Sequence, residues 1–165
     1  MSQHEAAYRR VLGALRGLIL RGELREGDRL PSVREIVAAE ALGIAADSPV
    51  VFRSRRYVVD DKAVQLATSY YPVDLARGTR ITYTDTGPGG SYAVLAELGH
   101  APASFTEYLL ARMPRPDETA QLDLPGGTPV IEITRHAFEV GGRSVEVNRM
   151  ILDGSAYLLD YSFSA

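Results

Sequence analysis

Three arginines lie within one stretch that is rich in strand-forming residues, Val50–Tyr71. Valine, tyrosine, threonine and phenylalanine favour strands and Asp60-Asp61 is a turn signal, so the stretch predicts a β-hairpin. Because side chains alternate faces along a strand, Arg53 and Arg55 point the same way, about 7 Å apart. Two guanidinium groups on one face can bind an anion. The alternative is an exposed strand face with ordinary ion pairs.

The register of this hairpin decides which residues face the arginines. With a two-residue turn at the aspartates, Thr68 lies opposite Arg53 and on the same face. Arg56 is one position out of phase and points to the other face. The hairpin therefore predicts an anion site that contains Arg53, Arg55 and Thr68.

A second candidate for anion binding is the glycine-rich loop TDTGPGGS, which leads into a predicted helix at 91–98. Gly89, Gly90 and Ser91 stand where the loop meets the helix. Free backbone N–H groups and the partial positive charge of a helix N-terminus favour an anion. The loop lacks the lysine and the spacing of a nucleotide-binding P-loop, and Gly-Pro-Gly-Gly is also a good turn. Both interpretations stay open.

Composition and motifs argue against several other classes of function. The chain has 165 residues, no cysteine and a net charge of −3, which disfavours a dominant nucleic-acid surface. His4, His100 and His136 lack the spacing of a metal site, and no nucleophile motif occurs. No apolar run is long enough to cross a bilayer, and the start lacks a signal-peptide core. We expect a cytoplasmic protein without catalytic residues, metal or cofactor, and without a membrane partner.

From residue 44 onward, the pattern predicts an α+β domain with an antiparallel sheet of about six strands and two or three short helices. Apolar and polar residues alternate within each predicted strand, and Gly141-Gly142 marks a second hairpin. The predicted strands are the two arms of 50–71 and the stretches 104–112, 129–140, 144–152 and 157–163, with an extended piece at 80–84. The predicted helices lie at 91–98 and 117–122.

The first 43 residues differ from this pattern. A helical periodicity covers 5–21, and Ser32 with Glu35 forms a capping box that opens a second helix at Val33. The run from Ile19 to Ile36 is I-x-x-G-x-L-x-x-G-D-R-L-P-S-x-R-E-I. It resembles the start of the winged helix-turn-helix domain of GntR-family bacterial transcription regulators.

This resemblance implies that Arg29, Ser32 and Arg34 lie near a DNA backbone. The recognition helix and the wing of that family do not follow here, because the chain continues directly into the hairpin at 50–71. We therefore expect residues 1–43 to be a truncated domain whose sequence-specific DNA binding is impaired, since no helix reads the base edges.

Residues 44–165 resemble the UTRA domain, the effector-binding partner of such DNA-binding domains in the HutC subfamily, which has a chorismate-lyase-like fold. The resemblance rests on the arginine-rich strand, the Ser-Tyr-Tyr-Pro run at 69–72, the glycine loop with its helix, and Gly142–Val147. It implies a pocket for a small anionic metabolite such as a sugar phosphate or a carboxylate. The implied lining is the arginine pair, the loop from Gly89 to Tyr92, and Glu146.

Glu146 would bind a hydroxyl or amine of the metabolite, and an ion pair with Arg135 or Arg149 is the alternative. The two resemblances together predict a GntR-type, HutC-type regulator that forms a homodimer, senses a metabolite and is not an enzyme. One rival is an enzyme, because the same fold hosts a lyase that acts on an aromatic carboxylate. Another is a dimerisation module that antagonises full-length regulators.

Overall fold

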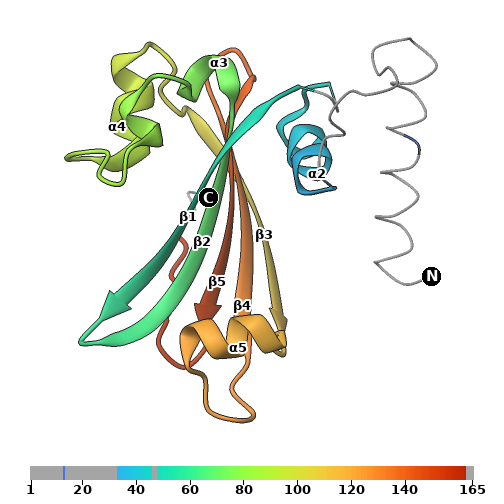
Figure 1. The fold of residues 1–165 in the computed structure, drawn as a ribbon, viewed down its shortest axis with the longest axis vertical. Helices are drawn as coiled ribbons and strands as arrows, with labels where there is room; N and C mark the ends of the chain where they lie inside the picture. Colours follow the sequence, from blue (N-terminus) through green and yellow to red (C-terminus); the bar gives the residue numbers. More distant parts are fainter. Residues whose placement is uncertain (1–12, 14–32, 46–47, 163–165) are drawn as a thin grey trace, which may run out of the picture.

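The computed structural model describes residues 13, 33–45 and 48–162 (Figure 1). Apart from residue 13, the helix predicted at 5–21 lies outside the described residues, as do the predicted DNA-contacting residues Arg29 and Ser32. The strands are β1 (Val50–Val59), β2 (Lys62–Pro72), β3 (Ser104–Arg112), β4 (Val130–Phe138) and β5 (Ser144–Asp153). The helices are α2 (Val33–Leu42), α3 (Val73–Ala76), α4 (Gly90–Glu97) and α5 (Pro116–Leu122), with a 3₁₀ turn, η1, at Arg80–Thr82.

The strands form one antiparallel sheet in the order β1-β2-β5-β4-β3. Two hairpins, β1-β2 and β4-β5, supply four of the strands, and β3 adds to β4 at one edge. The hairpins meet through the antiparallel pairing of β2 with β5 in the middle of the sheet. These elements confirm the predicted α+β class, the antiparallel sheet and both hairpins.

Two predicted extended segments are not strands. The segment after β5 crosses a face of the sheet, where Tyr157 and Leu159 pack against Met150 and its apolar neighbours. A segment that packs on a face cannot also pair at an edge, so the sheet has five strands and not six. Residues 80–82 form the turn η1 because the Thr79 hydroxyl accepts a hydrogen bond from the Ile81 N–H at 3.2 Å, with Ile81 fully buried.

A β-bulge sets the register of the β1-β2 hairpin. Asp60 and Asp61 have φ of 47° and 62°, as a two-residue type I′ turn requires. The register then shifts between Tyr57 and Val58, because Val64 is an extra residue in β2. The predicted opposition of Thr68 and Arg53 is therefore wrong.

In the observed register, Arg53 pairs with Ser69, and Thr68 pairs with Ser54. The Thr68 and Ser54 hydroxyl oxygens lie 3.1 Å apart. One extra residue thus moves Thr68 to the face of the sheet opposite to Arg53 and Arg55.

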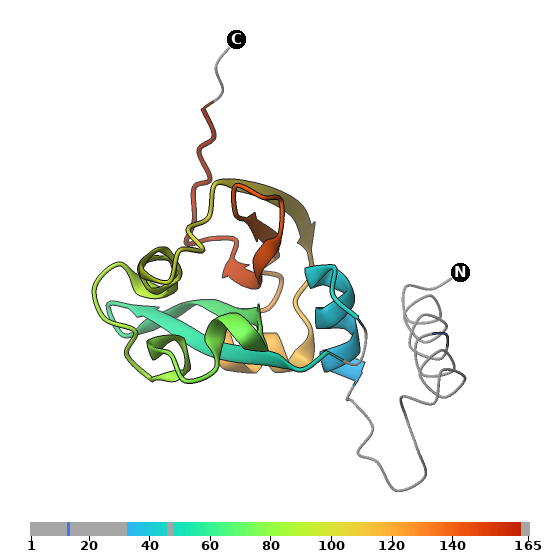
Figure 2. The ribbon, with the colours of Figure 1, turned by 90° about the horizontal axis from the view of Figure 1, so that it is seen from above.

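Helices cover both faces of the sheet. On the face that we call the α4 face, α4 packs through Val94 and Leu95 into a core that includes Tyr71 and Ile81. On the opposite face, the α5 face, Leu122 packs against Ile151 and its apolar neighbours. Seen from above, α4 and α2 lie on opposite sides of the sheet (Figure 2). The α4 face and the α5 face therefore form separate environments for polar residues.

Helix α2 covers Val33–Leu42 in the described residues and ends where Gly43 adopts φ of 70°. Ser32 of the predicted capping box lies outside the described residues. The Ile44 N–H donates to the Ala39 carbonyl at 3.0 Å, a typical cap of a helix C-terminus. Ile36 and Leu42 are buried, and the helix contacts β1, β2 and β5. The helix that the sequence assigns to the N-terminal unit thus packs on the sheet. Arg34 lies in this helix, but its side chain is not described.

A closed ring of alternating charges fixes α5 to the sheet. Arg112 donates from Nη1 and Nη2 to the two Glu118 oxygens at 2.7 Å each, and from Nε to Glu132 at 2.7 Å. Arg149 donates to Glu132 at 2.6 Å and to Glu118 at 3.3 Å. Burial alone would raise the pKa of Glu118, but the hydrogen bonds from Arg112 outweigh it and lower the pKa to about 2. The ring joins α5 to β3, β4 and β5.

The ring predicts a specific loss of stability in acid. Because the folded pKa of Glu118 lies below its ordinary value of 4.5, its stabilisation is complete above pH 4.5 and falls as the pH approaches 2. Glu118→Gln should cost about 2–3 kcal/mol at pH 7, since it removes the buried carboxylate to which Arg112 donates two charge-assisted hydrogen bonds. It should also flatten the dependence of stability on pH between about 5 and 2. Urea unfolding at several pH values measures both effects.

Asp117→Asn is the matched control, because Asp117 is an exposed carboxylate in the same helical turn. It should cost only a few tenths of a kcal/mol through the helix dipole. Equal losses in the two variants would show that the ring does not hold α5.

Candidate functional site

A row of polar side chains crosses the α4 face, with one residue from each strand. The registers align them in the order of the sheet: Arg53, Ser69, Asn148, Arg135 and Glu107. Neighbouring strands lie about 4.8 Å apart, so the row spans about 19 Å. Ser69 is fully buried in the middle of the sheet, where apolar residues are the rule. A polar row through a buried face therefore suggests a site and not a core.

A buried carboxylate lies beside this row. The Tyr71 hydroxyl donates to Glu146 Oε1 at 2.5 Å, and both residues are at most 1% exposed. Tyr92, on α4, faces the same carboxylate. Burial and then the charge of Glu146 raise the pKa of both tyrosines, which keeps them protonated as donors. Neither Arg135 nor Arg149 forms an ion pair with Glu146 among the described residues, so the structural alternative for Glu146 is not observed.

Arg53 and Arg55, two of the three arginines of β1, each donate one hydrogen bond to a described residue. Arg53 Nη2 donates to the Thr84 carbonyl at 2.7 Å. Arg55 Nη2 donates to the Ser69 hydroxyl at 3.3 Å, and its guanidinium lies 5.7 Å from the centre of the Tyr57 ring. Within the described part of the chain, no carboxylate forms an ion pair with either arginine. Their positive charges are therefore oriented but not neutralised there.

Four buried side-chain atoms of this face have no hydrogen-bond partner among the described residues. They are two donors and two acceptors: Arg53 Nη1, Arg55 Nε, Glu146 Oε2 and Asn148 Oδ1. An unsatisfied buried polar group costs about 1–3 kcal/mol, so such a concentration is unusual for a purely structural surface. A molecule with an anionic group and a hydrogen-bond donor could pair with both kinds of atom. We call Arg53, Arg55, Ser69, Glu146 and Asn148 the bipolar cluster.

One end of the polar row is already neutralised. Arg135 Nε donates to Glu107 at 2.6 Å, and the Tyr161 hydroxyl donates to the same carboxylate at 2.8 Å. The Arg135 guanidinium also lies 5.6 Å from the centre of the Phe105 ring. Because Arg135 has these partners, the available positive charge of the α4 face lies at the β1 end of the row.

The glycine loop positions α4 over the cluster. Gly89 has φ of 78°, and a Cβ there would approach Ala93 Cβ at 2.7 Å. The Gly87 N–H donates to Asp85 at 2.8 Å and the Gly90 N–H donates to the Gly87 carbonyl at 3.1 Å. Two N–H groups that an anion could use are thus engaged inside the loop, which favours the turn interpretation. Gly90 is the first residue of α4, one position earlier than predicted.

The structure brings most of the predicted site residues together. Arg53, Arg55, Tyr92 and Glu146 share the α4 face, and buried Ser91 lies within hydrogen-bonding reach of Tyr71. Thr68 is on the α5 face. The sequence reasoning missed four residues of this site: Ser69, Tyr71, Arg135 and Asn148. The available signal was a polar residue at an inward position of an otherwise apolar strand, which becomes readable only when the register is known.

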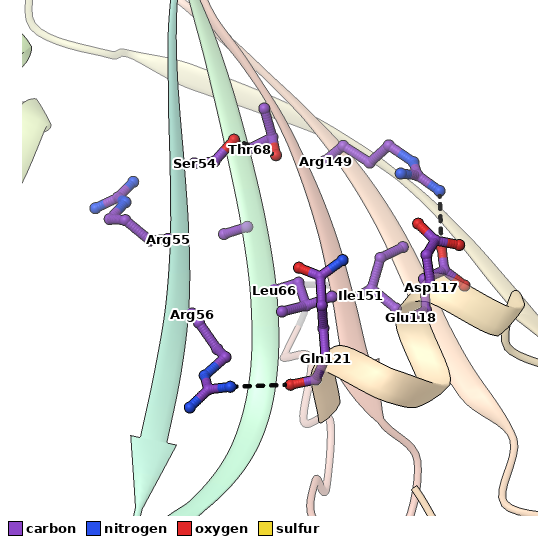
Figure 3. A pocket seen from close by; sticks show the side chains of 11 residues that line it. Ser54, Arg55, Arg56, Leu66, Thr68, Asp117, Glu118, Gln121, Arg149 and Ile151 are labelled. Carbon is purple, nitrogen blue, oxygen red and sulfur yellow. Dashed lines mark hydrogen bonds and ion pairs between the residues drawn. The ribbon is translucent and has the colours of Figure 1, made fainter. Parts of the chain in front are cut away.

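Thr68 and Arg56 line a different cavity, of about 320 Å³, between β1, β2, β5 and α5 (Figure 3). Here Arg56 Nη1 reaches the Gln121 carbonyl at 3.5 Å, and Arg149 points to Glu118. Arg55 points to the other side of β1 from Arg56 (Figure 3). Because Arg149 and Glu118 neutralise each other, this cavity has less uncompensated charge than the α4 face.

Two kinds of feature are absent from the described residues. No helix of residues 13, 33–45 and 48–162 is long and apolar enough to cross a membrane. Within the same ranges, no three histidine, aspartate or glutamate side chains gather as a metal ion would require.

Comparison with known proteins identifies the fold. Among solved structures, PhnF from Mycobacterium smegmatis superposes with a TM-score of 0.69 at 24% identity, over 77% of this chain and 56% of that one. The C-terminal domain of the histidine utilization repressor from Pseudomonas syringae pv. tomato superposes with a TM-score of 0.66 at 22% identity, over 77% of this chain and 87% of that one. These likenesses establish the fold.

Sequence comparison gives the family. A protein of Streptomyces coelicolor, described as an uncharacterized HTH-type transcriptional regulator, is 32% identical over 128 residues, which cover 76% of this chain and 48% of that protein. The chain thus spans about half the length of this curated relative. The relatives are transcription regulators or their domains and not enzymes. The UTRA domain model matches residues 22–157, and the chain therefore belongs to the UTRA domain family.

Proposed function

We propose that this chain senses a small anionic metabolite through the bipolar cluster and passes the signal to DNA binding. The observation that carries the proposal is the pair of arginines without a carboxylate partner in the described part of the chain. Arg53 Nη1 and Arg55 Nε are buried donors on one face, which suits a phosphate or a carboxylate. Charge-assisted hydrogen bonds of this kind contribute about 1.5–3 kcal/mol each.

The acceptors of the cluster narrow the class of metabolite. Glu146 Oε2 and Asn148 Oδ1 can accept from hydroxyl or ammonium groups. Arg53 and Asn148 lie two strands apart, about 10 Å between backbones, and the small Ser69 between them leaves room above β2. A molecule that has an anion at one end and hydroxyl or amino groups at the other fits this arrangement. A sugar phosphate or a small hydroxy or amino acid has that chemistry.

The coupling to DNA would pass through the sheet. The cluster lies on β1, β2 and β5, and α2 packs on these same three strands from the other side (Figure 2). A ligand that pulls Arg53 and Arg55 towards Glu146 would change the surface on which α2 rests. Ligand binding and DNA binding would then shift the same conformational equilibrium, and in this way an effector changes the affinity for DNA. We place this activity in the cytoplasm and in a homodimer.

Ligand binding by the arginines is testable with a control from the same strand. A thermal-shift screen of anionic metabolites should yield a ligand that stabilises the chain by about 2.7 kcal/mol at a hundredfold excess over its Kd. Arg53→Ala and Arg55→Ala should each weaken binding by 10-fold or more, because each removes a charge-assisted bond. Arg56→Ala removes a charge from the opposite face and should leave the Kd unchanged.

Titration calorimetry on the three variants gives the Kd values. A loss in Arg56→Ala as large as in Arg53→Ala would contradict the assignment of the site. Glu146→Gln separates the two halves of the cluster. This variant should weaken the binding of metabolites that have hydroxyl or amino groups more than it weakens the binding of inorganic phosphate.

DNA binding by the 165-residue chain should be weak and without sequence preference. The sequence after α2 does not resemble the recognition helix of the family, so no helix is expected to contact base edges in the major groove. Selection from a random duplex library should therefore enrich no motif, and the residual affinity should fall steeply with salt. A single enriched motif with a sub-micromolar Kd would disprove this impairment.

A further inference from the structure

The cavity on the α5 face has the size and the lining of a site for a small molecule. It lies between β1, β2, β5 and α5 and has a volume of about 320 Å³. Pockets that hold small ligands begin at about 300 Å³. Its floor is apolar, because Leu66 and Ile151 lie opposite each other on β2 and β5. The side chain of Gln121 extends from α5 over this floor (Figure 3).

Arg56 gives this cavity one positive charge that is not neutralised. Its Nη1 donates to the Gln121 carbonyl at 3.5 Å, which is the outer limit of a hydrogen bond. None of the ion pairs among the described residues includes Arg56. The other arginine of the lining, Arg149, pairs with Glu132 and Glu118 instead. The guanidinium of Arg56 is therefore available to an anion.

A pair of hydroxyl groups lies next to Arg56 on the same face. Ser54 and Thr68 are cross-strand partners, and their hydroxyl oxygens lie 3.1 Å apart. The two hydroxyls have two hydrogens, and the bond between them uses one, so the other can be donated to a ligand. Ser54 and Arg56 are about 7 Å apart along β1, which leaves space for an anion between them. A carboxylate there would accept from the planar guanidinium and from one hydroxyl.

The remaining lining narrows the class of anion. Asp117 and Glu118, in the first turn of α5, line the cavity on the side away from β1. Negative charges nearby disfavour a second negative charge on the ligand, so a monoanion is favoured over a phosphate. The apolar floor of Leu66 and Ile151 favours a hydrocarbon body. A carboxylate with a short aliphatic chain has both properties.

We propose that the α5-face cavity is a second ligand site, which binds a small aliphatic monocarboxylate through Arg56 and the hydroxyl pair of Ser54 and Thr68. The carboxylate lies between these groups, and the hydrocarbon chain lies over the apolar floor. The site stands back to back with the bipolar cluster, because consecutive residues of β1 and β2 point to opposite faces of the sheet. It uses other side chains than the cluster, so the proposal does not depend on a ligand at the α4 face.

An NMR titration of the isotope-labelled full chain with hexanoate tests the proposal. Hexanoate should bind saturably, and hexan-1-ol should bind about 10-fold more weakly or less, because it lacks the charge. Arg56→Ala should weaken hexanoate by about 10-fold or more, since it removes a charge-assisted hydrogen bond from an exposed side chain. Arg77→Ala is the matched control. It removes the same charge from an exposed position after α3 and should leave the Kd unchanged.

A second variant locates the site without a change in charge. Ser54→Tyr fills the cavity with a side chain that strands accept, and it should also weaken hexanoate by about 10-fold or more. The absence of saturable hexanoate binding would overturn the proposal, and so would an unchanged Kd in Arg56→Ala or in Ser54→Tyr. Inorganic phosphate that binds more tightly than hexanoate and depends on Arg56 would overturn the assigned class of ligand.

Discussion

The pairing of β2 with β5 is the contact on which the candidate site depends. Each hairpin forms from neighbouring residues, but this pairing joins segments about eighty residues apart and sets the two hairpins in register. It places Ser69 beside Asn148, and through them it aligns Arg53 with Arg135. A slip of one residue between the central strands would turn half of the site to the other face. The site is therefore a property of the register and not of either hairpin.

Local signals in the sequence were sufficient to predict most of the helices, strands and turns. The type I′ turn at Asp60-Asp61, the Gly-Gly hairpin and the short helices follow from turn chemistry and periodicity. The bulge at Val64 has no such signal, because valine is an ordinary strand residue and nothing local marks it as extra. The segment at 157–162 alternates like a strand, but its apolar residues are satisfied by packing on the sheet. Contacts between residues distant in the sequence determine both the bulge and the position of the segment at 157–162.

The site residues likewise divide into those that a local signal identifies and those whose role depends on contacts distant in the sequence. Arg53 and Arg55 stand out as charges inside a strand, and Glu146 was supplied by family resemblance. Tyr71 and Asn148 were missed, because a tyrosine or an asparagine in a strand is unremarkable until its neighbours are known. Unpaired buried atoms at this face reduce the stability of the fold, whereas the charge ring around Glu118 lies on the α5 face and its charged groups pair with one another. The polar groups that stabilise the fold and those available to a ligand are thus spatially separate.

The bulge at Val64 has a consequence for how this fold can change during evolution. Deletion of the extra residue would join Ala63 to Gln65 and restore regular pairing, with Val58 still opposite Ala63 and Tyr57 still opposite Gln65. Arg53 and Arg55 would keep their places on the α4 face, because β5 holds the part of β2 that pairs with them. The hairpin can therefore lose or gain a residue at this point without any change in the β1 contacts of the site, so hairpin length and site chemistry are free to vary independently.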